Sequence, residues 1–240
     1  MPLTPQERFS FADGEVLLVD KPLRWTSFDA VRKIRNAINP LKVKVGHAGT
    51  LDPLATGLLV ICTGKFTKRI NEFQAQEKTY TGTITLGATT PSYDLEQPID
   101  QRFDLTGITE EHILETAQSF VGEIEQIPPA HSAIKVGGER VYAKARRGEA
   151  VVVKSRQVYI REFEIVHIDM PCVEFRVVCS KGTYIRSLAS DFGKALNNGA
   201  HLSQLRRTAI GDFSVADAWQ LPDLVKHIKD VNFAASDENI

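Results

Sequence analysis

The pattern of apolar and polar positions predicts a chain that mixes strands and helices. Apolar runs and strict alternation are typical of strands, whereas apolar residues that recur every three or four positions are typical of amphipathic helices. The segments predicted as strands are 15–20, 58–62, 80–86, 151–169, 173–180 and 202–213. The segments predicted as helices are 26–38, 66–73, 109–120, 139–147 and 184–196. Because the two types do not alternate regularly, we expect an α+β fold with a central mixed, largely antiparallel sheet flanked by helices and loops.

Hydroxyl residues precede three of the predicted helices, where a side-chain oxygen can accept a hydrogen bond from the first helical turn. The predicted N-caps are Thr26 or Ser27, Thr109 and Thr183. No repeat or clear linker divides the chain, so we expect a single domain over residues 1–240 with a core from about residue 15 to residue 213. Residues 214–240 are predicted as a short tail with one short helix followed by polar residues.

The stretch from Val45 to Gly57, V-G-H-A-G-T-L-D-P-L-A-T-G, interrupts this pattern. It is too rich in glycine for a plain strand or helix, and it carries one carboxylate, Asp52, between apolar segments. Pro53 fixes its own φ and pushes Asp52 out of the helical region, which suits a carboxylate that reacts. The alternative is structural, because Asp52 and Pro53 also make a good N-cap and first position of a helix. The stretch alone leaves both interpretations open.

Composition narrows the class of protein without indicating an activity. The chain has 240 residues, of which 42% are hydrophobic and 25% are charged, as in ordinary globular proteins. No segment approaches the roughly 20 apolar residues that span a bilayer, and residues 1–13 do not resemble a signal peptide. Cys62, Cys172 and Cys179 form no C-x-x-C pair, so neither a disulfide framework nor a zinc site is indicated. We therefore expect a cytoplasmic protein without a bound metal.

Charged residues are unevenly distributed, although the net charge is only −1. Acids concentrate between residues 94 and 125, whereas basic residues gather in separate runs elsewhere. If the basic runs fold onto one face, they provide the positive surface that a nucleic-acid backbone needs; the alternative is a set of solvated helix faces. The candidates for RNA backbone contact are Lys135, Arg140, Lys144, Arg146, Arg147, Arg206 and Arg207.

Tyr80, Arg186 and Leu205 are further candidates with two interpretations each. Tyr80 begins a predicted strand and is either an aromatic residue of the core edge or a site residue. Arg186 lies one turn inside an otherwise apolar helix, so it is either solvated or buried with a carboxylate partner, because burial of a lone charge is costly. Leu205 precedes two arginines, which suits RNA contact but also an ordinary surface strand. The sequence has no Gly-rich phosphate loop, H-x-x-x-H pair or G-x-S-x-G motif, so no cofactor is indicated.

Several blocks of the sequence resemble the TruB family of bacterial tRNA pseudouridine synthases, which act on uridine 55 in the T-loop. The stretch V-G-H-A-G-T-L-D-P-L-A-T-G is similar to the catalytic motif of that family. The other blocks are V-D-K-P from Val19, K-T-Y from Lys78, P-P-A-H-S-A-I-K-V from Pro128, G-T-Y-I-R from Gly182 and G-A-H-L-S-Q-L-R-R-T from Gly199. They follow the family order and cover most of the chain, so the resemblance implies the pseudouridine synthase fold.

The resemblance implies a role for each matching residue. Asp52 matches the essential aspartate that attacks the target nucleotide, either at the uracil ring or through the ribose. Tyr80 matches the tyrosine that stacks on the uracil and takes its C5 proton, and Arg186 matches the arginine that pairs with the aspartate. His47 matches the histidine that fills the gap left by the extruded nucleotide, and Leu205 matches an apolar residue that packs against the base. The other residues implied around the pocket are Lys21, Pro22, Gly49, Thr50 and Tyr184.

The implied reaction detaches uracil at N1 and reattaches it at C5 without redox change, so no cofactor is implied. Flipping the base out of a folded T-loop costs roughly a few kcal/mol. The implied partner is the T-arm stem-loop of tRNA, bound by a monomer without guide RNA. Many family members have a C-terminal PUA domain, for which too few residues follow Phe213, so residues 135–147 are expected to contribute more to binding. Two alternatives stay open: a tRNA-binding or folding-assistance protein, and a pseudouridine synthase that acts on another RNA.

Overall fold

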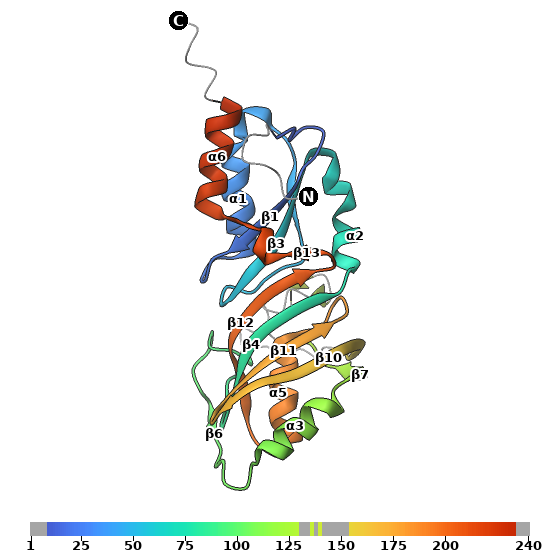
Figure 1. The fold of residues 1–240 in the computed structure, drawn as a ribbon, viewed down its shortest axis with the longest axis vertical. Coiled ribbons are helices and arrows are strands. Elements are labelled where there is room, and N and C mark those ends of the chain that lie inside the picture. Colours follow the sequence, from blue (N-terminus) through green and yellow to red (C-terminus); the bar gives the residue numbers. More distant parts are fainter. Residues whose placement is uncertain (1–8, 130–134, 137–138, 141–153, 234–240) are drawn as a thin grey trace, which may run out of the picture. The chain divides into compact units, whose positions relative to one another are not determined.

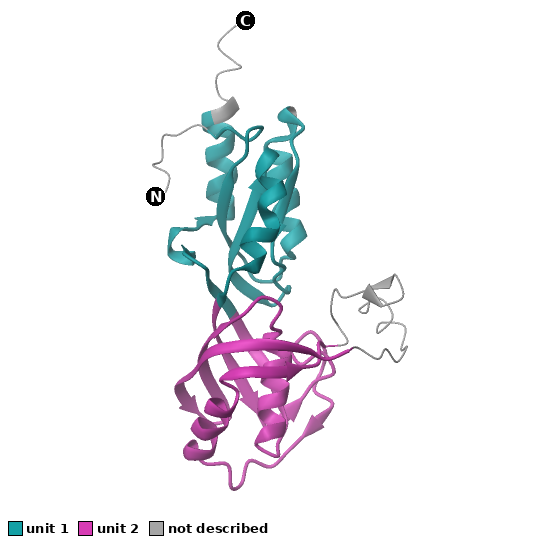
Figure 2. Ribbon diagram, turned by 90° about the vertical axis from the view of Figure 1, so that its right-hand side faces the viewer, with its two compact units in different colours: residues 1–78, 206–240 teal, residues 79–205 magenta. Residues whose placement is uncertain are grey.

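The structure, a computed structural model, describes residues 9–129, 135–136, 139–140 and 154–233. The chain divides into two compact units, which are coloured teal and magenta in Figure 2. Unit 1 comprises residues 1–78 and 206–240, and unit 2 comprises residues 79–205. Two strands, β4 (Lys78–Leu86) and β12 (Ala200–Ile210), have residues in both units.

Unit 1 contains a sheet in which β14, β1, β3 and the final residues of β12 follow one another. β1 (Val16–Lys21) pairs antiparallel with β3 (Ala55–Thr63) and parallel with β14 (Trp219–Gln220). Two short strands extend the sheet: β2 (Val45–Ala48) pairs with β3, and β13 (Phe213–Ser214) pairs with the end of β12. Nearly every residue of β3 is buried, as expected for an apolar strand in the middle of a sheet.

Helices α1 (Ser27–Ala37) and α6 (Leu221–Phe233) contact one another beside β1 (Figure 1). The N-terminus of α1 has a capping box, in which the Thr26 hydroxyl and the Asp29 carboxylate each accept a hydrogen bond from the other residue's amide. One face of each helix joins the alternate residues of β1 and β3 in a common apolar core. The remaining helical segments of unit 1 are η1 (Asn39–Leu41), η2 (Gly64–Arg69), α2 (Ile70–Ala75) and η3 (Val215–Asp217).

Unit 2 is built on a sheet with the strand order β12, β4, β11, β10, β7. A long hairpin joins β10 (Arg156–Asp169) to β11 (Cys172–Cys179), and β7 (Gly122–Gln126) pairs antiparallel with β10. Helices α3 (Glu110–Ser119) and α5 (Ile185–Ala195) cover the sheet (Figure 1). Phenylalanine rings in tilted and edge-on arrangements pack together in this unit. The short strands of unit 2 are β5 (Ala88–Thr89), β6 (Gln101–Arg102), β8 (Lys135–Val136) and β9 (Glu139–Arg140).

The predicted α+β class is confirmed, since helices flank a mixed sheet. The predicted caps Thr26 and Thr109 are also confirmed, because each hydroxyl accepts an amide hydrogen bond at the start of its helix. Thr183 is wrongly predicted as a cap: its hydroxyl donates to the Ser180 carbonyl, and Tyr184 takes the N-cap position of α5 without a side-chain bond. A hydroxyl that bonds back into the preceding turn is no longer available to the helix.

Two further predictions differ from the structure. The predicted helix 139–147 begins instead with the strand β9, and residues 141–147 lie outside the described residues. The predicted short tail from residue 214 contains η3, β14 and the 13-residue helix α6. Leu221, Leu224 and Ile228 of α6 are buried in the core of unit 1. The single-domain prediction stays a prediction.

Candidate functional site

Hydrogen bonds fix the backbone of the loop that joins β2 to β3 and carries Asp52. The hydroxyl oxygen of Ser27 accepts from the Leu51 amide at 2.8 Å, and it also lies 3.2 Å from the Leu51 carbonyl, to which it donates. The Arg24 amide donates to the Pro53 carbonyl at 2.7 Å, and the Asp52 carbonyl accepts a 3.1 Å bond from the amide three residues later. The turn leads directly into β3. The interpretation of Asp52 as a helix N-cap is therefore wrong, because no helix begins at Pro53.

Arg207 lies behind this loop and is almost completely buried, with 1% of its surface exposed. Its Nε donates to the Leu58 carbonyl at 2.8 Å, and its Nη2 donates to the Gly49 carbonyl at 3.1 Å. The prediction that Arg207 contacts an RNA backbone is not supported, because the guanidinium is enclosed by protein instead of being presented at the surface. The sequence shows two adjacent arginines and does not reveal which of them points inward.

Lys21, the last residue of β1, is a second buried cation near Asp52. Its ammonium donates to the carbonyls of Pro22 at 3.0 Å and Trp25 at 2.6 Å. Burial lowers the pKa of Lys21 to about 8; the Asp52 carboxylate opposes this change, and the Arg207 guanidinium adds to it. The Asp52 carboxylate therefore lies in the electrostatic field of this ammonium.

His47 and Thr50 are the other predicted site residues on β2 and the loop. His47 is half-buried, and burial lowers its pKa more than a backbone hydrogen bond with Gly49 raises it. The imidazole is consequently neutral at pH 7. Thr50 is exposed, and Gly49 has a φ of +93°, a conformation that glycine adopts without strain.

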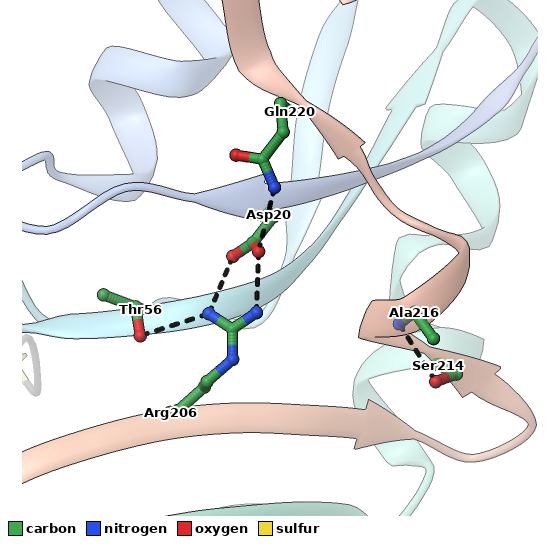
Figure 3. A network of polar contacts seen from close by, with 6 residues as sticks. All are labelled: Asp20, Thr56, Arg206, Ser214, Ala216 and Gln220. Carbon is green, nitrogen blue, oxygen red and sulfur yellow. Dashed lines mark hydrogen bonds and ion pairs between the residues drawn. The ribbon is translucent and has the colours of Figure 1, made fainter.

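Arg206 has the opposite environment from its neighbour Arg207. Figure 3 shows its guanidinium facing the Asp20 carboxylate, with Nη1–Oδ1 and Nη2–Oδ2 distances of 3.0 and 2.7 Å. Thr56 and Gln220 complete the network, at 3.4 Å from Arg206 and 3.3 Å from Asp20 respectively. The Arg206 side chain is 40% exposed, so solvent and an RNA backbone can reach it. Its contact with RNA stays a prediction.

Arg186, in the first turn of α5, is buried with 4% of its surface exposed. Its Nε lies 3.6 Å from Oδ2 of Asp94, which is itself 3% exposed, and its Nη1 donates to the Ser92 carbonyl at 3.2 Å. Of the two interpretations of Arg186, the structure agrees with burial beside a carboxylate, and Asp94 is such a carboxylate; the implied pairing with Asp52 stays a prediction. The acidic run from residue 94 contains many carboxylates, and only the fold shows that Asp94 is the one beside Arg186.

Tyr184 is held at the entrance of α5 by residues that sequence reasoning missed. The Gln126 side chain, which is fully buried, accepts from the Tyr184 amide at 2.7 Å and donates to the Tyr184 carbonyl at 3.1 Å. The Arg156 guanidinium lies 4.5 Å from the centre of the Tyr184 ring, a cation–π arrangement. Neither Gln126 nor Arg156 belongs to a recognisable motif. Tyr80 on β4 is buried, with 8% exposed, and Leu205 is half-buried.

The predicted RNA-contacting residues of the middle of the chain are only partly described. Lys135 and Arg140 face one another as a register pair of the strands β8 and β9. Lys144, Arg146 and Arg147 lie outside the described residues. Their predicted role stays a prediction.

The predicted site residues fall into two groups. Unit 1 contains Lys21, Pro22, His47, Gly49, Thr50 and Asp52, and unit 2 contains Tyr80, Tyr184, Arg186 and Leu205. Hydrogen bonds within unit 1 tie the Asp52 loop to α1 and β12. The pairing of Asp52 with Arg186 joins residues of different units and stays a prediction.

None of the three cysteines, all of which the structure describes, forms a disulfide bond. Cys62 and Cys179 are at most 1% exposed, and burial raises the pKa of Cys62 to about 11, whereas Cys172 is only half-buried. Among the described residues, no helix is long and apolar enough to cross a membrane.

Comparison with known proteins places most of the chain in one family. The family model described as TruB family pseudouridylate synthase (N terminal domain) matches residues 35–185. The model described as tRNA pseudouridylate synthase B C-terminal domain matches residues 186–237. Together the two models extend from α1 to beyond the end of α6. The family pattern therefore includes α6, which lies in the segment predicted from the sequence as a short tail.

Curated relatives and solved structures agree with these matches. A tRNA pseudouridine synthase B from Flavobacterium johnsoniae is 59% identical over 221 residues, covering 90% of this chain and 95% of the relative. One from Parabacteroides distasonis is 50% identical, with 95% and 98% coverage. A chain in the crystal structure of a Cbf5-Nop10-Gar1 complex is 30% identical with a TM-score of 0.73; the match covers 95% of this chain and spans 58% of that chain. The chain therefore belongs to the TruB family of pseudouridylate synthases.

Proposed function

We propose that this protein converts uridine to pseudouridine in tRNA, at position 55 in the T-loop, and that Asp52 is the carboxylate that attacks. The observation that carries the proposal is the fixed loop around Asp52, whose backbone is bonded on both sides of the carboxylate. Relatives that match nearly all of the chain are named tRNA pseudouridine synthase B, which supports this reaction and this class of substrate.

In the proposed reaction the bond between ribose C1′ and uracil N1 breaks, the base turns, and a bond forms between C1′ and C5. The proton on C5 leaves and N1 gains a proton, so substrate and product are isomers and no electrons are exchanged with another group. The attacking carboxylate has to be ionised. The buried cations Lys21 and Arg207, which lie around the loop, favour the charged form of Asp52.

The residues of unit 2 have the proposed roles of contacting the base and the nucleophile. Tyr80 stacks on the uracil and takes the C5 proton, and Leu205 packs against the base. Arg186 pairs with the attacking carboxylate in addition to Asp94, and its position one turn inside α5 suits a planar bidentate donor. The Gln126 amide and the Arg156 guanidinium restrict the movement of Tyr184, which lines the pocket in this proposal.

The proposed partner is the T-arm of tRNA, which the enzyme binds as a monomer, in the cytoplasm and without a guide RNA. Arg206, Lys135 and Arg140 supply positive charge toward the RNA backbone, together with the basic residues 144, 146 and 147. Neither a metal nor an organic cofactor is part of the proposal, because the isomerisation requires no electron transfer and no external group.

Tritium release tests the proposal with the purified protein and one tRNA transcript labelled at uridine C5. The wild-type protein is expected to release one tritium per tRNA, because C5 loses its hydrogen when it bonds to C1′. Asp52→Asn keeps the size of the side chain and removes the charge, so release should fall to the background rate while the dissociation constant for tRNA changes less than about threefold. The matched control is Asp13→Asn, an exposed acid on the surface of unit 1.

The outcomes separate the parts of the proposal. Release by wild-type protein from the transcript alone supports action without a guide RNA, and a transcript with cytidine at position 55 should release no tritium from the T-loop. Substantial turnover by Asp52→Asn would refute the role of Asp52. Release from other RNAs of the cell, but not from tRNA, would refute the proposed substrate.

A further inference from the structure

Arg207 bridges the two ends of the loop that carries Asp52. Gly49 follows β2 directly, and Leu58 lies in β3 after the Asp52 turn. The carbonyl groups of both residues accept from the same guanidinium, at 3.1 Å and 2.8 Å. One side chain from β12, far along the sequence, therefore sets the separation between the entrance and the exit of the loop.

The geometry of this bridge requires a guanidinium. Nε and one terminal nitrogen donate along one edge of a rigid plane, so two carbonyl groups are held at a fixed spacing. A lysine ammonium would supply a positive charge from a single point at the end of a flexible stem. Arg207 is also the bulkiest fully buried side chain of the described residues, so packing holds the plane in place.

Two glycines that flank the Asp52 turn, Gly49 in the loop and Gly57 in β3, lie close to Arg207. Gly57 has a φ of +102°, and a Cβ at that position would lie 2.2 Å from the Arg207 carbonyl oxygen. A Cβ on Gly49 would lie 3.5 Å from Nη1 of Arg207, at ordinary contact distance. At Gly57 the backbone thus approaches the main chain of Arg207 more closely than a residue with a Cβ allows, whereas at Gly49 it is the φ of +93° that favours glycine.

We propose that Arg207 is a positioning residue for the reaction: its guanidinium, by bonding Gly49 and Leu58 together, holds the Asp52 carboxylate at its place of attack. This inference rests on the proposed function of Asp52. Arg207 does not touch the nucleotide, so its effect is on the chemical step and not on RNA binding. Displacement of a reacting group by about 1 Å can cost on the order of 100-fold in rate.

Single-turnover kinetics of Arg207→Lys, with enzyme in excess over labelled tRNA, test the proposal. At saturating enzyme the observed rate constant does not depend on the fraction of inactive protein, so a loss of folded enzyme cannot imitate a slower chemical step. The rate constant for tritium release should fall about 100-fold, while the dissociation constant for tRNA stays within about twofold. Arg32→Lys, an exposed arginine paired with Asp29, is the control and should change neither value.

A second variant acts on the other end of the bridge. Gly49→Ala places a side chain at a φ of +93°, so the carbonyl of residue 49 should shift away from Nη2 and the same selective loss of rate should follow. This variant tests the proposal independently if Arg207→Lys does not fold. A wild-type rate constant in either folded variant would overturn the proposal, and so would a weaker dissociation constant with an unchanged rate constant. If wild-type protein releases no tritium, the proposed function fails instead.

Discussion

Two arginines are buried among the residues that the structure describes, one in each unit, and their surroundings differ. Arg186 in unit 2 lies beside the buried carboxylate of Asp94 and donates to one carbonyl. Arg207 in unit 1 donates to two carbonyls, and no carboxylate among the described residues forms an ion pair with it. Both are nearly inaccessible to solvent, at 4% and 1% exposure.

The type of hydrogen-bond acceptor, carboxylate or carbonyl, determines how strongly the charge of a buried arginine acts on its neighbours. A carboxylate partner compensates most of the charge of Arg186, so its field falls off within a short distance. Carbonyl dipoles compensate less, and the charge of Arg207 contributes to the lowered pKa of both Lys21 and His47, after the larger effect of burial. Unit 1 therefore has two buried cations, Lys21 and Arg207, around the Asp52 loop, whereas in unit 2 a buried carboxylate lies directly beside the buried arginine.

Removal of the Asp94 carboxylate from unit 2 should cause the largest of the three changes in the free energy of unfolding. Asp94→Asn keeps the shape of the side chain but removes the buried carboxylate that lies 3.6 Å from the Arg186 guanidinium, which should destabilise the fold by about 4 kcal/mol. Urea unfolding measured by circular dichroism gives this value, with Asp191→Asn, which removes a surface partner of Lys194, as the control. A loss below about 1 kcal/mol would show that Asp94 does not balance Arg186, and that the two arginines are alike.

A smaller loss of unfolding free energy is expected when a methyl group is added at Gly57, next to the backbone of Arg207. Gly57→Ala forces alanine into a φ of +102° and against the Arg207 backbone, so it should cost about 3 kcal/mol of unfolding free energy. Gly122→Ala is the matched control: it has a φ of +111°, but nothing lies within 4 Å of its added Cβ. The control should cost only about 1 kcal/mol, for the backbone conformation alone. Equal costs for the two variants would contradict the close approach at Arg207.

The smallest effect is a pH dependence that reports the charge around Asp52. The folded state lowers the pKa of Lys21 from 10.5 to about 8, so between these values the unfolded chain binds more protons than the folded protein. Stability should therefore increase as pH rises from about 8 to about 10.5, by about 2 kcal/mol. The difference in unfolding free energy between wild type and Lys21→Met, measured across this range, isolates the contribution. A flat difference would mean that Lys21 is not desolvated.

Sequence reasoning succeeded where the information lies within a few residues. The cap of α1 and the apolar run of β3 involve neighbours in the chain: Thr26 is one of the two predicted caps, and β3 contains the predicted strand 58–62. The motif around Asp52 was recognisable as a block for the same reason. Even there the local chemistry was ambiguous, because Asp52-Pro53 also suits a helix start, and only the tertiary bonds from Ser27 and Arg24 show a turn that enters a strand.

Sequence reasoning failed where the role of a residue depends on its burial or on hydrogen bonds to backbone groups far away in the sequence. Arg206 and Arg207 are identical in type and adjacent in sequence, and alternation along β12 turns one to Asp20 and the other into the interior. Carbonyl groups accept the bonds of Arg207, and every residue type has a carbonyl, so no sequence pattern could reveal its partners. Helix α6 is longer than the short helix predicted for the tail, because it is stabilised by the packing of Leu221, Leu224 and Ile228 in the core of unit 1.

The unequal burial of the three cysteines makes the natural chain suitable for labelling at one position. A maleimide dye reacts with thiolates that solvent can reach, which disfavours Cys62 and Cys179 and leaves Cys172, at the start of β11, as the accessible thiol. A fluorophore at Cys172 would report on unit 2 without any substitution. Fluorescence changes during tRNA binding could then be followed in the same protein whose tritium release is measured.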